Sequence, residues 1–207
     1  AELVVRAAED HEVGEIVAAA DLVVPDGVGV LWAGSIKGAG FPGRVPGVEL
    51  MEALVQQSVS EGWRVALYGA TPGIAEKAAK ELGKRYPGFK PAACWHGFLS
   101  ESEEQIMLTQ LQEIQPDIVF VALGAPRQER WIWAHKRQLP HTVLMGVGGS
   151  FDVFAGKVRR APRWMCELGL EWLFRLIQEP SRFRRMLALP RFAILVLREK
   201  LLRERMV

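Results

Sequence analysis

An apolar run, Asp117-Ile-Val-Phe-Val-Ala-Leu-Gly124, places six consecutive apolar residues between an aspartate and a glycine. A run this short and this continuously apolar is typical of a strand buried on both faces of a parallel sheet. Three similar runs end in glycine or proline, and a weaker one lies between them: Asp21–Pro25, Trp63–Gly69 and His141–Gly148, with Ala92–Trp95 as the weaker one. The sequence therefore predicts several parallel strands.

Stretches with helical periodicity separate these runs, near residues 48–61, 73–86, 101–114 and 127–138. Ser100, followed by Glu103 and Glu104, has the pattern of a helix N-cap with its capping box. Because strands and helices alternate, we expect an α/β fold built on a doubly wound, mostly parallel, Rossmann-like sheet.

One literal glycine motif does not indicate a dinucleotide. Gly38-Ala-Gly40-Phe-Pro-Gly43 has the G-x-G-x-x-G spacing, but it follows a helical stretch rather than a strand and contains Pro42. We therefore expect no dinucleotide and no other cofactor. With only Cys94 and Cys166 in 207 residues, a disulfide framework is not indicated, and a reducing compartment is the simpler interpretation.

Basic charge is concentrated at the end of the chain. Residues 181–207 hold eight Lys or Arg against two Asp or Glu, so the first 180 residues carry about −4 of a total charge of +2. Within this segment the apolar run Phe192–Leu197 is far shorter than the roughly 20 residues that span a bilayer. The pattern predicts a basic amphipathic helical appendage that lies on an anionic membrane surface and adds little to the sheet core.

Prolines suggest how the chain is divided. Pro162 and Pro180 bracket a predicted helix, and Pro190 is expected to split the helical segment that follows. We therefore predict an α/β catalytic domain over residues 1–162 and a helical, membrane-targeting appendage over residues 163–207.

Two glycine-rich turns are candidates for binding phosphate. In an open parallel sheet, ligands bind where the strands end, and the turns Gly69–Gly73 and Gly124–Arg127 each follow a predicted strand and open onto a helix. Such turns direct backbone N–H groups and the positive helix end at an anion. Either turn alone is explained equally well by the tight geometry that glycine permits. Two of them together favour a nucleotide.

Other polar residues at these strand ends allow two interpretations each. Asp26, directly after a predicted strand, is placed either as a general base or as the N-cap of a helix over residues 27–34. Arg44 either binds phosphate or is a solvated loop residue. Gln128 and Glu129 either hydrogen-bond a base or sugar or provide the polarity that a helix start favours. His96 either touches ligand or has a structural role.

Six blocks occur in order along the chain and together resemble the successive signature blocks of the WecG/TagA/CpsF glycosyltransferase family, over residues 15 to 190 approximately. They are Asp21–Gly29, Arg44–Gly47, Gly124–Glu129, Gly148–Gly156, Arg160–Pro162 and Gly169–Pro180. Any one of them is a weak signal, whereas the ordered set is highly specific. Pro46 and Glu49 depart from the family pattern, in which many members carry Thr and Asp.

The resemblance implies an inverting hexosyltransferase at the cytoplasmic face of the cell membrane, to which it is bound peripherally. Its donor would be UDP-N-acetylmannosamine or a related UDP-sugar. Its acceptor would be N-acetylglucosamine linked to undecaprenyl or another polyprenyl diphosphate. The β-linked product belongs to the biosynthesis of wall teichoic acid or a related surface polysaccharide of the cell wall. A homo-oligomer is compatible with this interpretation.

Carried over by motif position, Asp26 corresponds to the base that deprotonates the acceptor hydroxyl, and Arg44 faces the diphosphate. Gln128 and Asp152 match polar positions near the donor. The arginines of the appendage, Arg175, Arg182 and Arg185, would neutralise the leaving group. The chain has no Asp-x-Asp motif, so we expect arginines and helix dipoles, and no metal ion, to stabilise that charge.

Two alternatives remain at this point. A basic tail also suits a nucleic-acid-binding module, although apolar residues threaded through the tail argue against that partner. Another nucleotide-sugar enzyme, such as an epimerase or dehydrogenase, would require a dinucleotide fingerprint that the sequence does not contain.

Overall fold

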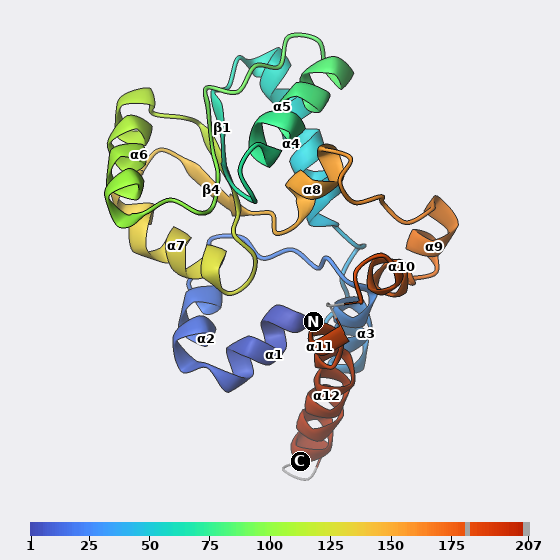
Figure 1. Cartoon of the computed structure of the whole chain (residues 1–207). Helices are drawn as coiled ribbons and strands as arrows, with labels where there is room; N and C mark the ends of the chain where they lie inside the picture. Colours follow the sequence, from blue (N-terminus) through green and yellow to red (C-terminus); the bar gives the residue numbers. More distant parts are fainter. Residues whose placement is uncertain (181–182, 205–207) are drawn as a thin grey trace. The chain divides into compact units, whose positions relative to one another are not determined.

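A computed structural model describes residues 1–180 and 183–204 of the chain (Figure 1). The chain divides into two compact units. One comprises residues 47–159, called here the sheet unit, and the other combines residues 1–46 with the chain from residue 160 onward, called here the helical unit. The boundary expected at residue 162 lies near the second junction. The segment 1–46, however, groups with the C-terminal part of the chain and not with the sheet.

The sheet unit contains four parallel strands among its described residues, in the order β2-β1-β3-β4. They are β1 (Val65–Gly69), β2 (Ala93–Trp95), β3 (Ile118–Ala122) and β4 (Val143–Gly146). In register, Leu67 of β1 lies between Cys94 of β2 and Phe120 of β3, and Phe120 pairs with Met145 of β4. All residues of the two central strands are buried, as their continuous apolar sequence predicts. The expected Rossmann-like α/β fold is confirmed.

Helices cover both faces of this sheet (Figure 1). The unit contains α4 (Gly47–Glu61), α5 (Ile74–Arg85), α6 (Glu101–Ile114), α7 (Arg127–His135), the 3-10 turn η1 (Lys136–Gln138) and α8 (Ser150–Phe154). The four helices predicted from periodicity are therefore confirmed. The capping box is confirmed as well, because the Ser100 side chain accepts from the Glu103 N–H while the Glu103 carboxylate accepts from the Ser100 N–H.

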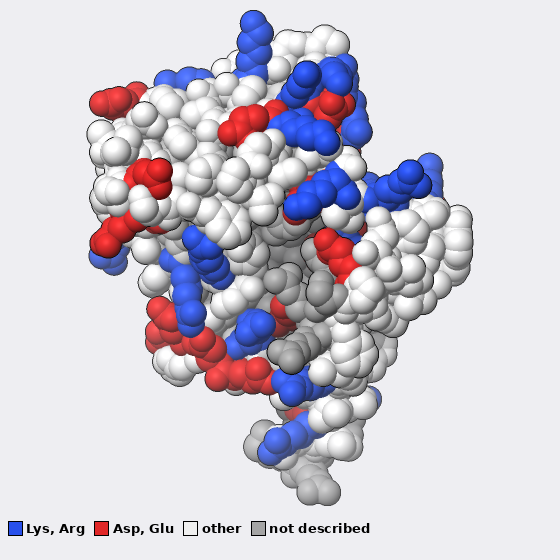
Figure 2. Space-filling view, in the orientation of Figure 1, with Lys and Arg blue, Asp and Glu red and all other residues white. Residues whose placement is uncertain are grey.

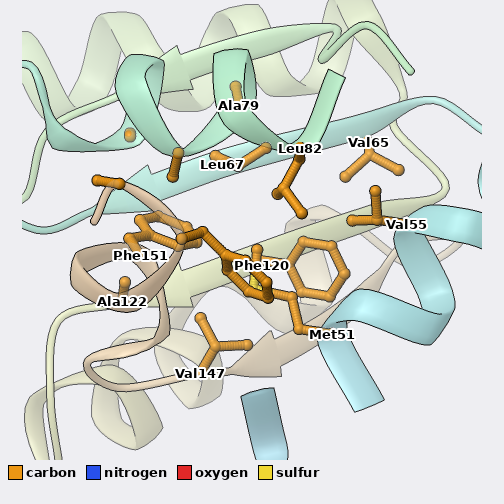
Figure 3. Packing of buried hydrophobic residues seen from close by; sticks show 14 of the residues in the cluster. Met51, Val55, Val65, Leu67, Ala79, Leu82, Phe120, Ala122, Val147 and Phe151 are labelled. Atoms are coloured by element: carbon orange, nitrogen blue, oxygen red, sulfur yellow. The ribbon is translucent and has the colours of Figure 1, made fainter. Parts of the chain in front are cut away.

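Alternate strand residues supply the two cores. Leu67 and Phe120 point to one face, where Met51 of α4, Leu82 of α5 and Phe151 of α8 pack around them (Figure 3). On the other face, Ala66, Tyr68, Val119 and Val121 meet the apolar sides of α6 and α7. The outer surface of α5 is solvated, and Figure 2 shows basic side chains over it with acidic ones among them.

The helical unit contains α1 (Glu2–Glu9), α2 (His11–Ala18), α3 (Val28–Ile36), α9 (Arg163–Glu167), α10 (Glu171–Gln178), α11 (Phe183–Met186) and α12 (Ala188–Glu204). A separate small core joins its two chain segments, since Phe192 and Val196 of α12 are buried together with Val5 of α1 and Ala33 of α3. The ion pair between Lys37 and Glu199 bridges the same two segments.

The predicted strand Asp21–Pro25 is wrong. The segment has no regular structure, and its Leu22 and Val23 are exposed. A strand must pair its N–H and C=O groups with a neighbouring strand. Here Pro25 O accepts from Val45 N at 2.9 Å, but this bond does not extend into a ladder among the described residues.

Two predictions about the C-terminal prolines also need correction. The single helix expected between Pro162 and Pro180 is two helices, α9 and α10, separated around Gly169, which adopts φ 72°. A Cβ at Gly169 would lie 2.8 Å from the Val28 side chain, so glycine suits both the turn and the contact. Pro190 does not split the following segment, because it lies in the first turn of α12, where its missing N–H has no helical acceptor to lose.

The apolar run Phe192–Leu197 does not lie as a whole on a surface. Phe192 and Val196 are 4% and 5% exposed inside the helical unit, whereas Ile194 between them is 64% exposed. In the described part of the chain, none of the helices combines the length and the hydrophobicity that crossing a bilayer requires.

Candidate active site

Backbone hydrogen bonds tie the turn after β1 to the loop after β2 and to the last residue of β3. Ala70 N donates to Ala122 O and Gly97 N donates to Ala70 O, both at 2.8 Å. Gly69 has φ 128°, and a Cβ there would lie 2.5 Å from the Ala122 backbone. Gly73 has φ 82° and is the N-cap of α5. The glycines of this turn are thus required by close approach and by backbone conformation, and the turn lies at the carboxyl edge of the sheet.

Two hydrogen bonds within the sheet unit hold the loop after β2. The Arg127 guanidinium donates to Gly97 O at 2.9 Å, which links the start of α7 to this loop. His96 Nδ1 accepts from Phe98 N at 3.2 Å. This contact is local and agrees with the structural interpretation of His96, while Phe98 beside it is exposed.

Gln128 is buried, and both ends of its carboxamide are engaged. Its Oε1 accepts from Gly148 N at 3.0 Å, and its Nε2 donates to Glu129 Oε1 at 2.8 Å. A Cβ on Gly146 would lie 2.6 Å from the same Nε2. Gln128 therefore clamps the first turn of α7 to the loop after β4. The second Glu129 oxygen, Oε2, is enclosed and has no hydrogen-bond partner among the described residues.

Asp152, in α8, is paired with a lysine that the sequence did not single out. Lys157 Nζ lies 3.1 Å from Asp152 Oδ1 and 3.4 Å from the Thr71 hydroxyl. The backbone N–H groups of Lys157 and Val158 also donate to Asp152 O. The side chain of Lys157 thus joins α8 to the turn after β1 at the carboxyl edge of the sheet.

A polar cluster that sequence reasoning missed lies under this edge, among α6, α7 and β1. Trp131 Nε1 donates to Glu104 Oε1 at 2.8 Å, and His135 Nε2 lies 3.5 Å from the same oxygen. The Tyr68 and Trp131 rings are 4.9 Å apart between centroids. Burial, reinforced by the charge of Glu104, raises the pKa of Tyr68 to about 12. The sequence feature that could have indicated this cluster is the spacing of Trp131 and His135, which lie one helical turn apart and so share one side of α7.

In the helical unit, Asp26 is not the cap of the helix that follows it. The N-cap of α3 is Gly27, a residue without a side chain that could bond the N–H groups at this helix end. Asp26 itself is exposed. The N-cap interpretation of Asp26 is therefore wrong, while its interpretation as a base stays a prediction.

Arg44 and Arg175 meet at one carboxylate in the helical unit. Arg44 Nη2 lies 3.5 Å from Glu171 Oε2, and Arg175 Nη2 lies 3.3 Å from Glu171 Oε1. Arg44 Nη1 also donates to Cys166 O at 3.4 Å. The interpretation of Arg44 as a solvated loop residue does not fit, because its side chain is only 17% exposed. The sequence did not indicate that Glu171 joins these two arginines.

The remaining predicted arginines are not placed. Arg182 lies outside the described residues, and of Arg185 only the backbone, in α11, is described.

The other predicted site residues are divided between the two units. The sheet unit contains Gly69, His96, Gly124, Gln128, Glu129 and Asp152, and the helical unit contains Asp26, Arg44 and Arg175. Among the residues with described positions, no three His, Cys, Asp or Glu side chains gather so that they could hold a metal ion.

Comparison with known proteins extends these observations. The sequence profile of the family "Glycosyl transferase WecG/TagA/CpsF family" matches residues 1–206. Three curated relatives share the name N-acetylglucosaminyldiphosphoundecaprenol N-acetyl-beta-D-mannosaminyltransferase. The protein of Bacillus subtilis (strain 168) is 34% identical over 199 residues, which cover 96% of this chain and 77% of the relative. That of Bacillus spizizenii is 34% identical, covering 89% and 71%, and that of Staphylococcus aureus (strain MW2) is 35% identical, covering 90% and 72%.

Proposed function

The chain belongs to the WecG/TagA/CpsF family of glycosyltransferases, and from this membership we propose that it transfers N-acetylmannosamine from UDP to N-acetylglucosaminyldiphosphoundecaprenol. The single observation that carries the proposal is the match over nearly the whole chain, with relatives from three species that are named for this transfer to that acceptor. The product would serve the assembly of wall teichoic acid or a related surface polysaccharide.

Asp26 is proposed as the general base. Its carboxylate takes the proton of the acceptor hydroxyl, and the resulting oxygen forms a bond to C1 of the donor sugar. The bond between C1 and the diphosphate oxygen breaks, UDP leaves with that electron pair, and the configuration at C1 is inverted. Support comes from the position of Asp26, which is exposed immediately before α3, while Gly27 caps that helix.

Neutralisation of the negative charge on the departing diphosphate is assigned to guanidinium groups. Arg44 and Arg175 supply paired cations that are fixed by contacts within the helical unit. Guanidinium groups form strong, directional hydrogen bonds to phosphate oxygens and require no metal ion as a bridge. We therefore propose a metal-independent reaction.

Binding of the nucleotide sugar is assigned to the carboxyl edge of the sheet. Gly69 and Gly124 shape turns in which the backbone comes close to a ligand, and Asp152 and Glu129 supply carboxylate oxygens that accept from sugar hydroxyl or base N–H groups. Gln128 supports this arrangement through its clamp between α7 and the loop after β4. His96 is assigned to the rim of the same edge.

Membrane attachment is assigned to α9 and α10 in place of the apolar run in α12. In α10, Trp172, Leu173, Leu176 and Ile177 form one apolar side, and none of the residues of this helix is fully buried. Trp164 and Leu168 add exposed apolar surface at and just after α9. On the face that Figure 2 shows, the surface over these helices is mostly uncharged. Exposed tryptophans on an amphipathic helix suit the boundary between lipid head groups and acyl chains. We place the protein peripherally at the inner face of the membrane, with anionic lipids as partners.

The test of the base is Asp26→Asn. With UDP-N-acetylmannosamine and a soluble analogue of the lipid-linked acceptor, kcat should fall by a factor on the order of 10² or more. The unfolding temperature should change little, because asparagine has nearly the size of aspartate and keeps one acceptor oxygen. Asp21→Asn, also exposed in the same irregular segment, is the matched control and should retain full turnover. Near-normal kcat in Asp26→Asn would remove the catalytic assignment.

The test of metal independence is treatment with EDTA in the same assay, which should leave activity intact. Activity lost to EDTA but restored by Mn²⁺ or Mg²⁺ would refute the metal-independent mechanism.

A further inference from the structure

Glu171 occupies a special position in the helical unit, because each of its two carboxylate oxygens lies close to a different arginine. Oε1 is 3.3 Å from Arg175 Nη2 and Oε2 is 3.5 Å from Arg44 Nη2. Glu171 and Arg175 are one turn apart on α10, whereas Arg44 comes from the segment before α4, 127 residues away in sequence. One carboxylate therefore connects two cations that the sequence keeps far apart.

The surroundings make these contacts stronger than ordinary surface ion pairs. The side chains of Arg44, Glu171 and Arg175 are 17%, 18% and 24% exposed. At this degree of burial, water screens the charges less than at an open surface. Two guanidinium groups repel one another, so a shared carboxylate is what holds them together. The trio keeps one net positive charge, which leaves it able to attract an anion.

We propose that Glu171 is a positioning residue, which orients the guanidinium groups of Arg44 and Arg175 toward one diphosphate. The inference rests on the proposed function, because it takes these arginines as the ligands of the donor's diphosphate. Cations already held in place lose less conformational freedom when the anion arrives and need no rearrangement as charge develops on the leaving group. Glu171 acts through the arginines and does not itself touch the substrate.

A purely structural salt bridge would give a different result. If Glu171 only fastened α10 to the segment before α4, its loss would lower stability and would weaken every ligand alike. A positioning role affects the phosphate part of the nucleotide selectively. Comparing UDP with uridine therefore separates the two roles, because uridine has the base and ribose without the phosphates.

The experiment uses Glu171→Gln in the full chain. Glutamine has nearly the same size, but it has one acceptor oxygen, and its NH₂ group faces a guanidinium that can only donate. Calorimetric titration should show the Kd of UDP rising roughly tenfold while that of uridine stays unchanged. Turnover should fall by a comparable factor. Glu171→Asp, which keeps the charge but retracts it, should show the same selective loss and serves if the glutamine variant does not fold.

Glu167→Gln is the matched control. Glu167 pairs with Arg163 at 3.1 Å, four residues away as in the Glu171–Arg175 pair, but the two side chains are 65% and 93% exposed. It should bind UDP as the unaltered protein does.

Arg44→Ala separates failure of the inference from failure of the proposed function. It should weaken UDP binding, and adding Glu171→Gln to it should cost less than Glu171→Gln alone, since one of the two arginines is already gone. If Arg44→Ala binds UDP normally, its assigned role and the inference both fall. The positioning role is overturned if Arg44→Ala weakens UDP binding but Glu171→Gln leaves it unchanged. It is also overturned if Glu171→Gln strengthens the binding of UDP, or if Glu171→Gln weakens the binding of UDP and of uridine equally.

Discussion

At the scale of single residues, Gln128 shows how one buried polar side chain can hold two segments of a candidate site together. Its position at the start of α7 allowed two interpretations, a contact to base or sugar and simple helix-start polarity. The structure places both ends of its carboxamide on neighbours, Gly148 N and Glu129 Oε1. A buried amide with both ends satisfied stabilises the loop after β4, because leaving either end unpaired would be costly.

Lys157 provides a test of how Asp152 is held. Lys157→Met removes the cation 3.1 Å from Asp152 Oδ1. The pair is partly solvated, so we expect less than about 1 kcal/mol of lost stability. The KM for the donor should nevertheless rise several-fold, because Asp152 loses its fixed orientation, and Lys157→Arg should largely restore it. Lys84→Met breaks the comparable exposed pair with Glu81 on α5 and is the control. Equal donor KM values for the two methionine variants would contradict this role of Lys157.

Tyr68 gives a prediction for the dependence of stability on pH. Its pKa is raised from 10.0 to about 12, chiefly by burial, so the folded protein keeps the phenolic proton at pH values where the unfolded chain loses it. The contribution is therefore complete below pH 10 and is lost as pH rises toward 12.

Chemical denaturation across this alkaline range should show the free energy of unfolding falling more steeply for the unaltered protein than for Tyr68→Phe. Only two tyrosines are present in the chain, and the other, Tyr86, lies near the surface. The pKa of Tyr86 is raised as well, by burial and by its hydrogen bond to Glu52, but the shift is smaller than that of Tyr68, so Tyr86→Phe is the control and should keep most of the slope. If the free energy of unfolding falls equally steeply with pH in Tyr68→Phe and in the unaltered protein, Tyr68 is not the cause of the fall.

At the scale of secondary-structure elements, α12 combines two roles that its sequence does not separate. Its buried residues Phe192 and Val196 close a core with α1 and α3, while other residues of the same helix are exposed. Helical periodicity explains the division, because Phe192 and Val196 are four residues apart on one side while Ile194 lies on another.

Phe192 and Ile194 therefore form a matched pair for mutagenesis. Phe192→Ala should lower the free energy of unfolding of the helical unit by about 3 kcal/mol, since it removes a buried aromatic side chain. Ile194→Ala, at an exposed position of the same helix, should stay within about 0.5 kcal/mol of the unaltered protein. Denaturant titration measures both. Similar losses for the two variants would mean that α12 does not pack as described.

At the scale of the whole molecule, the proposed membrane contact combines charge with apolar surface. Basic residues are concentrated after residue 180, and two exposed tryptophans, Trp164 of α9 and Trp172 of α10, lie just before them in the sequence. Each Lys or Arg near an anionic leaflet adds up to about 1 kcal/mol, and salt weakens this part of the attraction. Apolar burial depends far less on screening by salt.

Vesicle sedimentation can separate these contributions. The protein should bind anionic vesicles, and binding should weaken but persist as salt is raised. Replacing Trp164 and Trp172 together by serine should abolish the part that persists. Trp133→Ser, at a comparably exposed position of α7, is the control and should bind normally. Salt-resistant binding by the double variant would place the membrane contact elsewhere.

Much of the sheet unit follows from the amino-acid sequence alone. Continuous apolar runs, helical periods and the Ser100 capping box depend on neighbouring residues, so they can be recognised before any tertiary contact is known. The ordered motif blocks likewise identified the family from which Asp26, Arg44 and Arg175 were taken as site residues. The glycine-rich turns marked the carboxyl edge of the sheet for the same local reason.

The tertiary structure decided what depends on partners distant in sequence. Asp21–Pro25 has the composition of a strand, but an apolar run carries no information on whether a neighbouring strand is present to pair with it. Residues 1–46 join the C-terminal part of the chain because Val5 and Ala33 pack on α12. The role of Glu171 could be recognised only from the folded structure, in which Arg44 lies beside it. Periodicity and capping act over a few residues, whereas pairing and burial depend on which segments meet, and only the folded chain determines that.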